Sequence, residues 1–210
     1  MYKLYWRERT GAFAAAAVMA ELDIPYEGVH VDTARREHER ADYRALNPMA
    51  QIPTLILPDG TIMTESAAMA LYLAETKTDN GLVPPTGDPR RAHFLRWLFF
   101  APSNLYETIR RYSYSDRYTA DPTGAEDVCA AACSHIDALW DMVAEAMGGG
   151  PFFLGDAYSL LDIYLAMLAT WHHDPPALYR RQPAIAHLVE ATAARPAIAP
   201  VWRQHSMDRY

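Results

Sequence analysis

The sequence predicts two structural regions in one chain: a mixed α/β region, followed by a region built only of helices. Short strand and helix patterns alternate up to Glu75, a stretch rich in Pro, Gly, Asp and Thr comes next, and only helical periodicity follows it. We therefore place an α/β domain at residues 1–77, a linker at 78–88 and an all-helical domain at 89–210.

The first region reads in the order β-α-β-α-β-β-α. Strand patterns cover residues 3–6, 26–31, 52–57 and 61–64, and helical patterns cover residues 11–22, 33–46 and 66–75. The charged segment 33–46 also fits an irregular structure. Because Pro58, Asp59 and Gly60 form a turn signal between the last two strand patterns, we expect these to pair as a hairpin.

The second region carries apolar residues at helical spacing and shows no convincing strand pattern. The helical segments are residues 90–112, 125–147, 159–172 and 183–194. We expect a helix bundle. Ser159 and Asp162 stand as an N-cap and its acidic N3 partner before the third segment, which predicts a capping box with a structural role.

Composition limits the classes of partner. The chain has 210 residues, half of them hydrophobic, and a formal net charge of -7. Nucleic-acid binding needs clustered Lys and Arg, whereas the arginine pairs here are scattered among acids, so small molecules or proteins are better candidates. No apolar run approaches a membrane span and the polar start does not fit a signal peptide, so we expect a cytoplasmic protein without membrane contact.

Pro53 stands at the entrance of a strand pattern, where its missing N–H conflicts with the ladder. If the Ile52–Pro53 bond is cis, the backbone N–H and C=O of Ile52 face outward and can pair with an extended peptide-like ligand. We predict the cis bond, because it reconciles a proline with the entrance of a strand; an ordinary trans proline at a sheet edge is the alternative.

Glu65 and Ser66 open the helical pattern 66–75. A serine here is explained fully as an N-cap. A helix N-terminus also attracts a carboxylate, and a neighbouring carboxylate attracts an ammonium group. The pair would therefore hold both charged ends of one amino-acid headgroup.

In this order and spacing, the segment Asn47–Pro53, the pair Glu65–Ser66 and the Ser159–Asp162 box resemble the motifs of cytosolic glutathione S-transferases of bacterial type. The resemblance covers essentially the whole chain and leaves the class open. It implies a thioredoxin-like N-terminal domain, a C-terminal helical bundle, a homodimer and glutathione as co-substrate. The glutathione-binding residues that it implies are Gln51, Ile52, Pro53, Glu65 and Ser66.

The catalytic position departs from the family pattern. The family has a Tyr, Ser or Cys near the end of the first strand, whereas this chain offers neither Ser nor Cys there and has Trp6 about where a tyrosine would stand. Thr10 lies nearest the place of the serine and is the candidate catalytic residue. A plain cap of the first helix is the other interpretation, and the two are compatible.

Trp6, Tyr106 and Tyr112 are candidates for a second, apolar substrate site, although aromatic residues at helical spacing usually pack in a core. We expect no metal, because the adjacent His172 and His173 would diverge on a helix.

The resemblance implies a detoxification enzyme that activates the glutathione thiol for attack on a small apolar electrophile. Peroxidase, dehalogenase and isomerase variants use the same thiolate and are not separated by sequence. Two other interpretations stay open: a catalytically weak or inactive glutathione-binding or protein-interaction module, and a carrier of apolar ligands.

Overall fold

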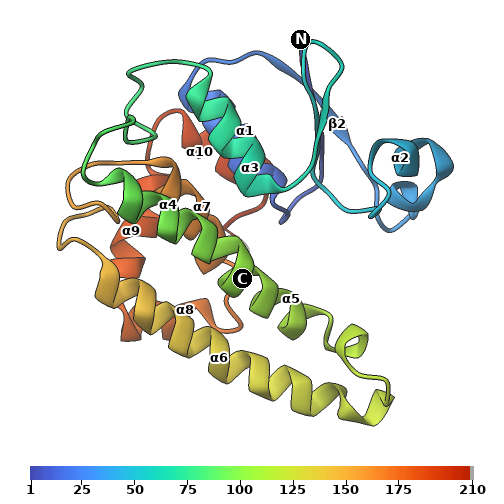
Figure 1. The fold of residues 1–210 in the computed structure, drawn as a ribbon. Coiled ribbons are helices and arrows are strands. Elements are labelled where there is room, and N and C mark those ends of the chain that lie inside the picture. Colours follow the sequence, from blue (N-terminus) through green and yellow to red (C-terminus); the bar gives the residue numbers. More distant parts are fainter. Residues whose placement is uncertain (209–210) are drawn as a thin grey trace. The chain divides into compact units, whose positions relative to one another are not determined.

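The computed structural model describes residues 1–208, which fall into two compact units (Figure 1). One unit joins Met1–Val83 to residues 193–208, and the other is Pro84–Thr192. The predicted helical domain 89–210 therefore differs from this grouping at its end. The physical reason is that Ile198, Val201 and Trp202 are buried within the first unit, with the Trp202 ring 5.4 Å from that of Phe13.

The sheet of the first unit confirms the predicted thioredoxin-like fold. Its four strands lie in the order β2-β1-β3-β4, with β1 parallel to β2 and antiparallel to β3, and β3 antiparallel to β4. The strands are β1 (Tyr2–Trp6), β2 (Tyr26–His30), β3 (Thr54–Ile56) and β4 (Ile62–Met63).

Two helices, α1 (Ala12–Glu21) and α3 (Ser66–Glu75), lie side by side on the sheet (Figure 1). All residues of α1 from Ala12 to Met19 are buried, and its alanines allow the close packing. Across the sheet lies α2 (Ala41–Leu46), after a 3-10 turn η1 (Glu37–Glu39). The predicted helix 33–46 is thus shorter, because the Asp32 carboxylate caps a turn and Arg36 has a φ of 56°.

In the second unit, the predicted helix 90–112 has three parts: α4 (Arg91–Phe100), a π-helical segment η2 (Ala101–Tyr106) and α5 (Glu107–Ser113). Pro102 explains η2, since it lacks an N–H and its ring crowds the preceding turn. Within this segment Ser103 Oγ donates a hydrogen bond to the carbonyl of Phe99 at 2.6 Å.

The rest of the unit is also helical. Short 3-10 turns η3 (Ser115–Tyr118) and η4 (Pro122–Gly124) lead to α6 (Ala125–Ala146), α7 (Leu160–Ala169), α8 (Pro175–Arg181) and α9 (Pro183–Ala193). Neither α8 nor α10 (Ile198–Gln204), which packs on α1, was predicted, because each is seven residues long and contains proline. In both helices the prolines lie in the first turn, where an N–H is not needed. Among residues 1–208, no helix is both long and apolar enough to span a membrane.

The predicted capping box is confirmed at the start of α7. The buried Asp162 carboxylate accepts hydrogen bonds from Ser159 N at 2.8 Å and Ser159 Oγ at 2.9 Å, and a third from Phe153 N at 2.7 Å. Burial raises the pKa of Asp162 to about 6, against the opposing effect of these donors. The carboxylate thus joins the loop at Phe153 to a helix whose every residue is buried.

Candidate functional site

Two buried side chains fix the loop before β3. Tyr43 Oη donates to the carbonyl of Gln51 at 2.7 Å, and Asn47 Nδ2 donates to the same oxygen at 2.8 Å. Tyr43 Oη also lies 3.0 Å from Thr54 Oγ1. The two donors and Thr54 hold the segment on both sides of Ile52, whose bond to Pro53 is cis, as predicted.

The starts of α1 and α3 meet at Pro53. A Cβ atom at Gly11 would lie 2.7 Å from both Cβ and Oγ of Ser66, and 3.5 Å from Pro53 Cδ. Only a glycine allows this approach. Residues distant in the sequence therefore gather in one place, with the first-turn N–H groups of two helices nearby.

Thr10 immediately precedes this contact. Its hydroxyl donates to the carbonyl of Arg7 at 2.8 Å and lies 3.4 Å from Ala12 N. The preceding Arg9 has a φ of 52°, so the chain turns sharply between β1 and α1. The Thr10 hydroxyl proton is thus used inside the loop in this structure.

Glu65 precedes α3 with a φ of 65°, a backbone conformation that residues other than glycine rarely adopt. Its side chain is exposed, whereas that of Ser66 is buried. Backbone strain of this kind persists where surrounding structure or function requires it.

The three residues predicted for a second substrate all have aromatic or histidine neighbours. The Trp6 ring lies 5.1 Å from His30 and 4.8 Å from His205. In the helical unit, Tyr106 lies 5.2 Å from Trp171 and Tyr112 lies 6.0 Å from His173. Their role toward a substrate stays a prediction.

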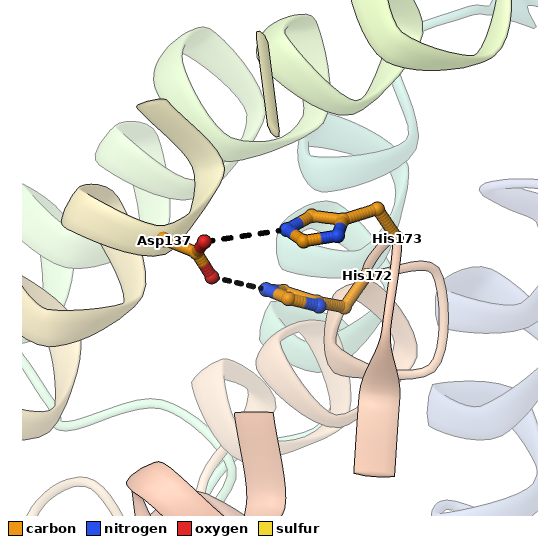
Figure 2. Close-up of side chains that lie close together, drawn as sticks. All are labelled: Asp137, His172 and His173. Atoms are coloured by element: carbon orange, nitrogen blue, oxygen red, sulfur yellow. Dashed lines mark hydrogen bonds and ion pairs between the residues drawn. The ribbon is translucent and has the colours of Figure 1, made fainter. Parts of the chain in front are cut away.

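His172 and His173 lie on the same side of the chain, which corrects the expectation that they diverge (Figure 2). They follow the end of α7, so helical geometry does not separate them, and their rings stack at 4.2 Å. Both point at Asp137 of α6: His172 Nε2 lies 3.1 Å from Oδ1, and His173 Nε2 lies 3.4 Å from Oδ2.

Other contacts of this cluster fit a hydrogen-bonded node better than a metal site. His172 Nδ1 accepts from Asp174 N at 2.9 Å, so the ring proton is on Nε2 and is donated to Asp137. Arg181 Nη1 also donates to Asp137 Oδ1, at 2.7 Å. A metal at His172 Nε2 would have to displace that proton beside an existing cation.

Comparisons with known proteins agree with this arrangement. Residues 12–76 match the family profile of the glutathione S-transferase N-terminal domain. The uncharacterized GST-like protein YncG of Escherichia coli K12 is 31% identical over 174 residues, which cover 81% of this chain and 82% of YncG. Glutathione S-transferase GstA of Escherichia coli O157:H7 is 24% identical, over 93% of this chain and 94% of GstA.

A solved structure extends the likeness to the whole fold. A glutathione transferase homologue from Sulfitobacter, solved with bound glutathione, superposes with a TM-score of 0.88 at 29% identity, over 97% of this chain and 98% of that one. The fold is that of a thioredoxin-like domain joined to a helical domain. The chain belongs to the glutathione S-transferase family.

The sequence did not predict a role for Tyr43 and Asn47, the two residues that hydrogen-bond the Gln51 carbonyl. Tyr43 lies in a charged segment without a motif, and Asn47 was read only as part of the proline loop. A buried polar side chain needs a partner, but the sequence does not say which one.

Replacing Tyr43 by Phe is expected to lower the free energy of unfolding by about 1–2 kcal/mol, because the Gln51 carbonyl and the buried Thr54 hydroxyl each lose a partner. Denaturant unfolding measures this loss, and calorimetry should show glutathione binding weakened several-fold. Tyr114→Phe, at an exposed ring of the helical unit, should change neither. A lower free energy of unfolding with unchanged glutathione affinity would show that Tyr43 does not position the loop.

Proposed function

We propose that this chain is a glutathione transferase that activates the glutathione thiol for attack on a small apolar electrophile. One observation carries the proposal: Gly11 at the start of α1 lies against Ser66 at the start of α3 and against Pro53. The three segments that the family uses for glutathione are thereby neighbours. Binding of glutathione by the Sulfitobacter homologue supports the assignment.

In this proposal, glutathione lies along the loop that contains Gln51, Ile52 and Pro53. The backbone of Ile52 pairs with the cysteinyl part of the ligand. The γ-glutamyl carboxylate is held at the N-terminus of α3 by Ser66, and its ammonium group by Glu65. The headgroup thus places its negative carboxylate at the positive end of the α3 dipole and its positive ammonium group beside the negative Glu65.

The chemical task is to lower the pKa of the thiol, which is about 8.5 when free, by about 1–2 units. Hydrogen-bond donors aimed at the sulfur stabilise the thiolate. The Thr10 hydroxyl and the first N–H groups of α1, at Gly11 and Ala12, are the donors that we assign to it. Thr10 must rotate its proton away from the Arg7 carbonyl to take part.

Trp6 in the first unit, and separately Tyr106 and Tyr112 in the second, remain our candidates for contact with the apolar electrophile. Simple conjugation, peroxide reduction, dehalogenation and isomerisation all use the same thiolate, and any of them is compatible with these residues. The homodimer, the cytoplasmic location and a role in detoxification stay predictions.

One observation favours a second candidate, a module that binds glutathione without turnover. The Thr10 hydroxyl donates within its own loop, which leaves the thiolate only backbone donors if the bond to Arg7 persists. Turnover of an activated aryl chloride, measured beside glutathione affinity, separates the two. Binding without turnover would identify the module.

Thr10→Ala should lower turnover about ten- to a hundredfold near pH 6.5, because the bound thiol loses a charge-assisted donor. A donor of this kind corresponds to a thiol pKa higher by about 1–2 units, so much of the turnover should return by about pH 9. Thr10→Ser keeps the hydroxyl and should stay active throughout. The pH dependence of kcat measures the effect.

A uniform loss at every pH would indicate a damaged helix start instead. An unchanged profile would leave the N–H groups of Gly11 and Ala12 as the thiolate donors.

A further inference from the structure

The segment of residues 195–208 forms polar contacts with the C-terminal end of α1 and with the loop that precedes α1. At the C-terminal end of α1, Arg195 forms a two-point ion pair with Glu21, with Nη2 to Oε2 at 2.9 Å. At the other end, the carbonyl of His205 accepts a hydrogen bond from Arg9 N at 3.1 Å. The second contact falls in the loop that carries Thr10.

The His205 ring fills the space behind this loop. His205 is only 1% exposed. The ring lies 4.8 Å from Trp6 at the end of β1 and 5.9 Å from Phe13 in the first turn of α1. His205 therefore contacts the residues on both sides of the turn from β1 to α1.

The imidazole of His205 is a polar ring in a fully buried position. Its Nδ1 is buried and has no hydrogen-bond partner among the described residues. Burial lowers the pKa of His205 to about 4, although the nearby Glu8 carboxylate works in the opposite direction. The ring is thus neutral near pH 7 and contacts Trp6 and Phe13 through its flat faces and edges, whereas the bond to Arg9 N comes from the main chain of His205.

Arg9 is the point at which this support matters. Its φ of 52° is unfavourable for a side chain, and its N–H is held by the His205 carbonyl. Thr10 and Gly11 follow directly, and Gly11 touches Ser66 and Pro53. A shift of the loop would displace both the hydroxyl and the start of α1 from the glutathione sulfur.

We propose that His205 is a positioning residue that holds the loop Arg7–Gly11, and with it Thr10, in the conformation that stabilises the glutathione thiolate. The inference rests on the proposed function for its effect on the thiol, but the support of the loop is a property of the free protein. The C-terminal segment thereby completes a site that otherwise lies in the first part of the chain.

The test compares His205→Ala, which removes the ring, with His205→Phe, which restores a flat ring of similar size. Ultraviolet absorbance of the thiolate measures the pKa of bound glutathione, and amide hydrogen exchange of residues 9–12 measures the loop in the free protein. Arg195→Gln is the matched control, because it loosens the same segment at the far end of α1.

In His205→Ala we expect the bound thiol pKa to rise by about one unit, turnover near pH 6.5 to fall about five- to tenfold, and exchange at residues 9–12 to speed up. His205→Phe should restore all three. Arg195→Gln should lower the melting temperature without changing the thiol pKa or that exchange. If His205→Ala does not fold, His205→Leu, which keeps apolar volume without the flat ring, replaces it in the same comparison.

Unchanged exchange and an unchanged thiol pKa in the folded alanine or leucine variant would overturn the proposal. Equal effects of Arg195→Gln would overturn it too, since they would indicate general loosening. If the parent protein binds no glutathione, the proposed function fails, and faster exchange in the His205 variants alone would still support the positioning role.

Discussion

Glu65→Gln is expected to weaken glutathione binding about ten- to a hundredfold, because the ligand ammonium group loses a charge-assisted partner worth about 1.5–3 kcal/mol. The substitution keeps the size of the side chain and the backbone conformation. Titration calorimetry measures the affinity. Glu75→Gln makes the same change in charge at the other end of α3 and should bind glutathione like the parent protein.

Glu65→Gly is a sharper variant of the same experiment. At a φ of 65° a glycine is less strained than a glutamate, so the unfolding free energy should increase by about 1 kcal/mol while glutathione binding weakens at least as much as in Glu65→Gln. Ser66→Ala should also weaken binding. If Glu65→Gln and Ser66→Ala both bind glutathione like the parent, the headgroup assignment is wrong.

Asp162→Ala is expected to lower the free energy of unfolding by about 3–5 kcal/mol at pH 7. This exceeds the effect of an ordinary helix cap, because Phe153 N, Ser159 N and Ser159 Oγ would all lose a buried acceptor. Denaturant unfolding measures the loss. Asp156→Ala, at an exposed position of the preceding loop, should change stability by no more than about 0.5 kcal/mol.

The loss at Asp162 should depend on pH. Its pKa is raised by burial to about 6 from the model-compound value of 3.8, so the stability that the side chain contributes is complete below pH 3.8 and decreases as pH rises through about 6. The difference between parent and Asp162→Ala should therefore be larger near pH 4 than at pH 7, by up to about 3 kcal/mol. A difference that grows with rising pH would contradict the raised pKa.

Local signals predicted much of this molecule. The helix Ser66–Glu75 was predicted from its apolar pattern with the bounds that the structure gives it, but its N-cap is Glu65 and not the predicted Ser66, which is the first helical residue. The cis bond at Pro53 followed from a proline that conflicts with a strand, and the Ser159–Asp162 box from its spacing. In each case the determining residues lie within a few positions of one another.

Features that depend on distant residues were missed. The return of α10 to the first unit depends on Trp202 packing on Phe13, nearly the whole chain length away. The approach of His172 and His173 depends on Asp137 of another helix. For Thr10, the sequence indicated the position but not that its hydroxyl donates to Arg7, which is a property of the backbone turn.

A crystal structure with glutathione tests the central claim most directly. We expect the γ-glutamyl group at Glu65 and Ser66, the cysteinyl backbone paired with Ile52, and the sulfur within about 3.5 Å of Thr10 Oγ1 or of the N–H groups of Gly11 and Ala12. Two results would contradict the account: an ordered glutathione away from Pro53 and Ser66, or no glutathione at this place in crystals grown at a saturating glutathione concentration.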